Sequence, residues 1–112
     1  MSILLMLYVS IPKINNNNSS TTLTTFTFNE VENIIKYRCG VCHASNPTFD
    51  GFEDPPAGLV FDTTQDIINN IDGIKSQSID SDIMPPGNLT GMTENERQKL
   101  AEWIKAGAPI NN

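Results

Sequence analysis

The chain is short and acidic, with 112 residues and a formal net charge of −6 at pH 7. This length fits one small domain, whose core is marginal unless a disulfide, a metal or a large cofactor reinforces it. The charge disfavours binding to nucleic acid, whose phosphates require a basic face, and adsorption to anionic lipid. It fits either a protein partner with a basic docking patch or an acidic surface that only aids solubility.

Residues 1–14 form an apolar N-terminal segment. Its most apolar part, Met1–Val9, is shorter than the ~20 residues of a transmembrane helix, and no basic residue precedes Lys13 as a secretory signal would require. We interpret the segment as a signal remnant, the end of a membrane helix or a short packing segment. Residues 15–28 form a polar, low-complexity linker, and the folded domain is expected over residues 29–112.

The spacing of apolar residues predicts helices and no strand of useful length. We expect the first helix to begin at Asn29 and the second at Asp62, each with a carboxylate or amide three residues later in the capping-box position. The last helix is expected to have Thr93 as its cap, Glu96 as the capping-box partner and Gly107 at its end. The predicted core consists of apolar residues on these helices and just before the second one: Ile34, Ile35, Leu59, Phe61, Ile67, Ile71, Leu100, Trp103 and Ile104.

Two segments rich in proline and glycine separate the helices. Residues 44–60 and 76–92 are expected to be long loops, because this composition forbids long regular elements. Gly73 is expected to bend or shorten the second helix. The fold class is therefore all-α: three or more helices with long loops that wrap around a bound group.

The only two cysteines and the only histidine of the chain lie together, in the run Cys39-Gly40-Val41-Cys42-His43. This is C-x-x-C-H, the pattern of covalent haem attachment. Each thiol can add to one vinyl group of the haem, and the residue after the second cysteine then lies under the iron. The sequence therefore predicts one covalent haem c, with His43 as the proximal ligand.

Three other interpretations of the cysteine pair are less favoured. A thioredoxin-like redox pair normally opens a helix after a strand, and a structural zinc site needs four ligands. A local disulfide is the third. The free ring nitrogen of His43 is expected to donate to a backbone carbonyl in the following loop, with Pro55 or Pro56 as candidates.

An electron carrier also needs a second axial ligand, and ligation by two histidines is impossible because the chain has only one. Four methionines are available, of which Met1 and Met6 precede the linker. Met84 is favoured, because Pro85 restricts it to an extended conformation and Pro86 stiffens the loop behind it. Met92 directly precedes the cap of the last helix, where an apolar residue more often packs. Asn88 either donates a hydrogen bond near the ligand or, as we favour, forms a turn with the preceding glycine.

The CGVCH motif, the MPP segment at Met84 and the final helix LAEWIKAGAP resemble a class I cytochrome c domain. PTFDGF from Pro47, PPAG from Pro55 and MPPGNLTGMT from Met84 are similar to the C-terminal cytochrome c domain of the bacterial membrane-bound urate oxidase (urate hydroxylase) family. The resemblance implies that the two cysteines bind haem and that His43 and Met84 ligate its iron. That family's membrane catalytic domain is missing from this sequence, so we expect a split-gene product or a fragment.

The main functional hypothesis is single-electron transfer, with no catalytic residue assigned in the domain itself. Expected partners are redox proteins, such as a membrane-bound urate-oxidising domain and a respiratory oxidase. The alternatives are a peroxidase-like haem enzyme and a redox or gas sensor, both with an open or displaceable sixth position. Because c-type haem attachment takes place outside the bacterial cytoplasm, we expect a location on the periplasmic side of a membrane, tethered or soluble.

Overall fold

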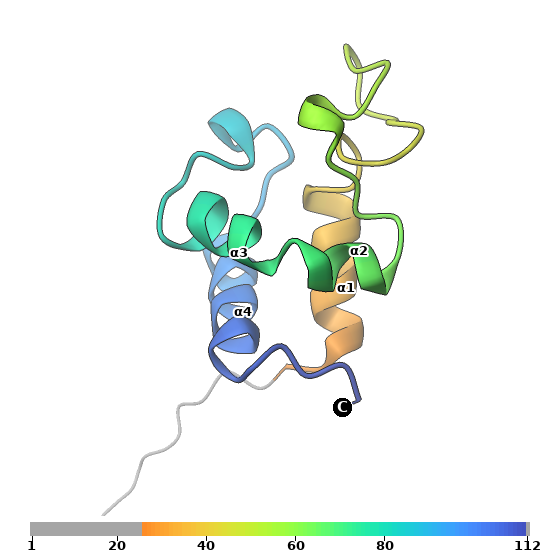
Figure 1. The fold of residues 1–112 in the computed structure, drawn as a ribbon. Helices are drawn as coiled ribbons and strands as arrows, with labels where there is room; N and C mark the ends of the chain where they lie inside the picture. Colours follow the sequence, from red (N-terminus) through yellow and green to blue (C-terminus); the bar gives the residue numbers. More distant parts are fainter. Residues whose placement is uncertain (1–25, 112) are drawn as a thin grey trace, which may run out of the picture.

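Helices and loops make up the whole of residues 26–111, the part of the chain that the computed structural model describes, and this range contains no strand (Figure 1). The helices are α1 (Phe28–Arg38), α2 (Thr64–Asn69), α3 (Ile71–Ile74) and α4 (Glu94–Lys105). Short helical turns occur over Pro56–Gly58, Lys75–Ile79 and Pro86–Asn88. The all-α class is confirmed, as a compact domain with three main helical segments: α1, the interrupted α2–α3, and α4.

The predicted N-terminal segment and most of the predicted linker lie outside the described residues. Within residues 26–111, no helix is long and apolar enough to cross a membrane.

The predicted start of α1 is wrong by two residues, because Thr27 and not Asn29 is the cap. The Thr27 hydroxyl accepts from the Glu30 amide at 3.2 Å, and the Glu30 carboxylate accepts from the Thr27 amide at 3.2 Å. The same spacing of cap and carboxylate recurs two residues later, so the sequence offered two equivalent starts. Only the earlier one keeps Phe28 in the helix, where its ring packs against Trp103 at 5.8 Å between centroids.

The predicted start of α2 is wrong by one residue, because two overlapping pairs of residues have the spacing of a capping box there too. Thr63 caps the helix with Asp66 as its reciprocal partner, while Asp62 accepts hydrogen bonds from Ser45 on the preceding loop. The interruption expected at Gly73 lies at Asn70 instead, where α2 ends and α3 begins.

The prediction for α4 is confirmed at both ends. Thr93 and Glu96 form a capping box, with the Thr93 hydroxyl accepting from the Glu96 amide at 3.0 Å. Gly107 follows the helix with φ of 96°, a left-handed conformation that glycine adopts without steric cost.

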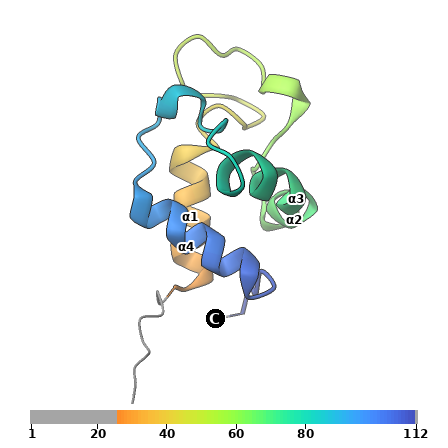
Figure 2. The ribbon, with the colours of Figure 1, turned by 90° about the vertical axis from the view of Figure 1, so that its left-hand side faces the viewer.

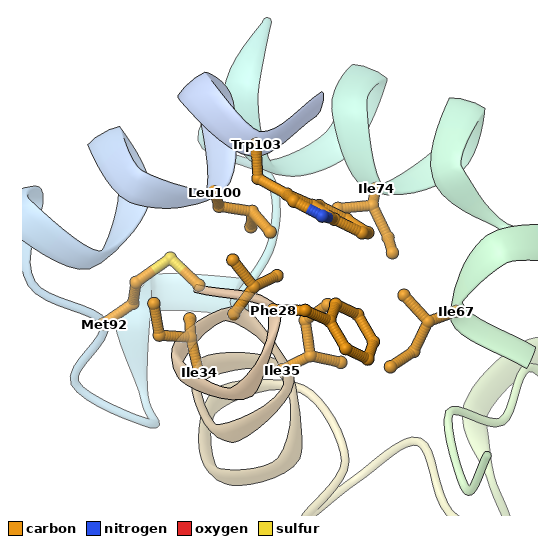
Figure 3. Packing of buried hydrophobic residues seen from close by; sticks show 9 residues of the cluster. Phe28, Ile34, Ile35, Ile67, Ile74, Met92, Leu100 and Trp103 are labelled. Atoms are coloured by element: carbon orange, nitrogen blue, oxygen red, sulfur yellow. The ribbon is translucent and has the colours of Figure 1, made fainter. Parts of the chain in front are cut away.

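The hydrophobic core lies between α1 and α4, which cross in Figure 2, and is closed by α2 and α3. Trp103 is fully buried, as expected for a core residue, and its indole donates to the Pro109 carbonyl at 2.8 Å. Of the other predicted core residues, Leu59, Phe61, Ile71 and Ile104 are only half-buried. The buried cluster, most of which Figure 3 labels, consists of Phe28, Val31, Ile34, Ile35, Ile67, Ile74, Met92, Leu100 and Trp103.

The cap assignment of α1 predicts different effects for two neighbouring substitutions. Thr27→Ala should lower the free energy of unfolding by about 1 kcal/mol, because the amides of the first turn lose their acceptor. Asn29→Ala, the matched control, should leave stability within about 0.5 kcal/mol, since an exposed residue inside the helix is replaced by a better helix former. Urea denaturation of both variants measures the difference, and equal losses would contradict the assignment.

Candidate haem-binding site

One apolar cavity of about 370 Å³ is lined by all four predicted haem-binding residues. Cys39, Cys42 and His43 reach it from the end of α1, and Met84 reaches it from the second long loop. The volume falls within the ~300–1,000 Å³ of typical ligand sites. The other wall residues are mainly apolar and include Phe52, Pro56, Leu59, Phe61, Ile74, Pro85 and Leu89.

A second hollow of about 700 Å³ lies on the surface between α1 and α4. It is larger, but it is open to solvent and lined mostly by polar and charged side chains such as Glu30, Asn95 and Lys99. It contains none of the predicted site residues, and its walls are unsuited to a flat apolar cofactor. The smaller cavity is therefore the candidate site.

The attachment motif forms a tight turn at the carboxyl end of α1. Cys39 is the C-cap of the helix, and its carbonyl accepts from the amides of Cys42 at 3.2 Å and His43 at 2.9 Å. Gly40 passes so close to the helix that a Cβ built on it would lie 2.8 Å from the Lys36 carbonyl oxygen. Glycine at this position therefore lets the turn fold back under the helix and present both thiols to the cavity.

The surroundings of the two thiols differ from those of a thiol–disulfide redox pair. Burial, and secondly the neighbouring Cys42, raise the pKa of Cys39 to about 12, against a lowering effect of Arg97. Burial also raises the pKa of Cys42. Redox-active pairs instead have lowered thiol pKa values, often at a helix N-terminus, whereas this pair follows a helix C-terminus. No disulfide joins Cys39 and Cys42.

The zinc interpretation also lacks support in the structure. Among residues 26–111, no three or more His, Cys, Asp or Glu side chains are grouped so as to hold a metal ion. A structural zinc site requires four such ligands.

His43 is held by a backbone carbonyl of the first long loop, as expected, but the acceptor is Leu59 and not Pro55 or Pro56. Its Nδ1 lies 2.9 Å from the Leu59 oxygen. The chain after the turn at Pro56–Gly58 runs back beside His43, whose carbonyl accepts from the Phe61 amide at 2.7 Å. This return path brings Leu59 to the ring, so Nε2 is the nitrogen available to a metal.

Met84 and Met92 have different surroundings. Met84 lines the cavity, and its amide donates to the Gln77 carbonyl at 2.8 Å, next to a cis Met84–Pro85 peptide bond. Met92 is 4% exposed and packs in the hydrophobic core, as the sequence predicted. The Asn88 side chain forms two hydrogen bonds with the Met92 backbone: its Nδ2 donates to the carbonyl and its Oδ1 accepts from the amide, at 3.0 Å each. Asn88 also forms a turn with the preceding glycine, as we favoured, because it has φ of 50° at the end of the helical turn Pro86–Asn88.

Two arginines that sequence reasoning did not single out also belong to the site. Arg38 lines the cavity and donates to the Thr90 carbonyl at 2.6 Å. It also forms a bidentate ion pair with the Glu96 carboxylate. Burial tends to raise the pKa of Glu96, but its hydrogen bonds to Arg38 and Thr93 outweigh this effect and lower it. Arg97 donates to carbonyls of the loop that contains Met84. No local sequence signal identifies these contacts, since they join distant segments.

Comparison of the chain with known protein families, curated proteins and solved structures gives no match. The functional assignment therefore rests on the chemistry and geometry of the site.

The close approach of Gly40 to α1 predicts that Gly40→Ala is harmful. The added methyl group must displace the helix end or the turn, at a cost of about 1–3 kcal/mol, and should reduce the fraction of protein that carries haem. Asn33→Ala is the matched control, because it replaces an exposed residue of α1, outside the cavity, by a better helix former. Urea denaturation and the ratio of haem to protein absorbance measure both effects. A Gly40→Ala variant as stable and as haem-loaded as Asn33→Ala would refute the steric argument.

Proposed function

We propose that this protein is a single-electron carrier of the class I cytochrome c type, with one covalent haem c. The observation that carries the proposal is that Cys39, Cys42, His43 and Met84, which come from two separate loops, line one apolar cavity. The haem, when bound, would supply an iron that alternates between Fe(II) and Fe(III) and so carries one electron.

Cys39, Cys42 and His43 would hold the haem in the cavity. Each cysteine would be joined to one vinyl group by a thioether bond, with its sulfur on one vinyl carbon and the hydrogen of the thiol on the other. The Nδ1 proton of His43, donated to the Leu59 carbonyl, fixes the orientation and tautomer of the ring. Nε2 would then be free to ligate the iron.

Met84 and the apolar walls would act on the iron and on its surroundings. The Met84 thioether would be the second iron ligand, and Met/His ligation raises the reduction potential above that of two histidines. Phe52, Leu59 and Ile74 would keep water away from the metal and lower the local dielectric. Water exclusion and fixed ligands both favour fast one-electron exchange.

The proposed donor is a urate-oxidising domain in the membrane and the proposed acceptor is a respiratory oxidase, on the periplasmic side. This part of the proposal is supported by the likeness of PTFDGF, PPAG and MPPGNLTGMT to the cytochrome c domain of the membrane-bound urate oxidase family. Leu89, which lines the cavity yet is 63% exposed, offers an apolar contact at its mouth. The exposed carboxylates of Glu53, Asp54 and Asp82 lie one or two residues from cavity-lining positions and favour a basic partner surface.

Visible spectra of the purified protein, oxidised and reduced, test the proposed function. The proposal predicts a low-spin c-type spectrum with the weak far-red band of sulfur-to-iron ligation in the oxidised state. A high-spin spectrum that changes on adding peroxide or carbon monoxide would contradict it and favour the enzyme or sensor alternatives.

The ligand assignment predicts opposite outcomes for the two methionines. Met84→Ala should abolish the far-red band and lower the reduction potential by more than about 60 mV, equal to a tenfold change in a one-electron equilibrium. Met92→Ala should keep the band and lose stability instead, by about 2–5 kcal/mol, because it leaves a hole in the core. An unchanged potential in Met84→Ala would refute the assignment.

The net charge of −6 and the exposed carboxylates of Glu53, Asp54 and Asp82 predict salt-sensitive electron exchange with a basic redox protein. The second-order rate measured by stopped flow should fall by about tenfold as ionic strength rises to the physiological range. Asp54→Asn combined with Asp82→Asn should weaken this dependence, whereas Glu102→Gln, on α4, should not. A rate that is independent of salt would argue against a basic partner.

A further inference from the structure

We propose that Arg97 is a positioning residue that holds the Met84 loop closed over the metal. This inference rests on the proposed function, since it concerns how the methionine ligand is kept in place. Arg97 lies on the second turn of α4, outside the haem attachment motif, and its role there follows from contacts in the structure.

One guanidinium nitrogen of Arg97 binds both ends of the segment that leads to Met84. Its Nη1 donates to the carbonyl of Ser78 and, at 3.2 Å, to the carbonyl of Met84. Ser78 is 3% exposed, so the hydrogen bond from Arg97 to its carbonyl reaches a buried residue. The segment between the two carbonyls is thereby tied to a helix of the hydrophobic core.

The backbone of Met84 is fixed on both sides of its Cα. Its amide donates to Gln77 at 2.8 Å, and its carbonyl accepts from Arg97. The next residue, Pro85, is buried and has a φ fixed by its ring. Only the side-chain torsions of Met84 are then left to place the sulfur.

Removing one of these two anchors affects ligation directly. A thioether is a weak iron ligand, so an added ligand such as imidazole competes with it whenever the loop opens. The apparent affinity for imidazole equals its intrinsic affinity multiplied by the fraction of open loop. A hydrogen bond to a charged donor shifts such an equilibrium by about tenfold to a hundredfold. The affinity for imidazole therefore reports how firmly Arg97 holds the loop.

The position of Arg97 also separates its role from that of Arg38. Arg38 holds the far end of the same loop, through the Thr90 carbonyl, and lines the cavity itself. Arg97 does not line the cavity, and it contacts the loop at Met84 itself. An effect of Arg97 on the metal must therefore pass through the loop or through its charge.

The test is titration of the oxidised, haem-loaded protein with imidazole, followed by the far-red band. Arg97→Gln should bind imidazole about tenfold to a hundredfold more tightly than the unchanged protein and should show a weaker band, with haem still covalently attached. Arg97→Lys keeps the charge on a side chain one bond shorter, so its affinity should rise by a smaller factor. Lys99→Gln, the matched control, removes a charge from α4 and an ion pair to Glu30 but touches no part of the loop, and should behave as the unchanged protein.

Unchanged imidazole affinity in Arg97→Gln would overturn the inference, and so would an equal rise in Lys99→Gln, because the effect would then come from charge alone. If Arg97→Gln does not fold, Arg97→Lys decides the question: a rise in affinity supports the inference and an unchanged affinity overturns it. Failure of the proposed function would give a distinguishable result. In that case the unchanged protein itself would lack the far-red band, because Met84 would not be an iron ligand.

Discussion

The rest of the structure depends on an apolar cavity that the chain's own side chains do not fill. Its walls are mainly apolar side chains, and covering apolar surface stabilises a fold by roughly 25 cal/mol per Å² removed from water. A domain of this size has only about 5–15 kcal/mol of stability in total. An apolar group held in the cavity would therefore add a large share of the domain's stability, and the covalent haem proposed above would be such a group.

The helices hold in place the two long loops that line the cavity, which have almost no regular structure of their own. The end of α1 supplies the thiols and His43, and the return of the first loop past Leu59 sets the orientation of the imidazole. From α4, Arg97 reaches the second loop at Met84. Under the proposed function, the positions of His43 and Met84 would thus be set by a few hydrogen bonds to backbone carbonyls, and core packing would act by holding α1 and α4 in place.

The sequence was informative where the chemistry is local and ambiguous where it depends on the path of the chain. The Cys39–His43 motif and the cap of α4 could be recognised because their residues are neighbours in sequence. The start of α1 was misplaced because two capping patterns overlap there, and only the packing of Phe28 selects between them. Leu59 and Arg97 could not be assigned, since their contacts arise only when distant segments meet.

Intact mass of the purified protein in denaturant, after expression with a c-type maturation system, tests the central claim most directly. The account predicts a single species heavier than the chain by one haem, and a proteolytic fragment containing Cys39–His43 that retains the whole added mass. Acidic organic solvent should not extract the haem. An unmodified chain mass, or haem that leaves on extraction, would contradict covalent attachment at this motif and with it the electron-carrier function.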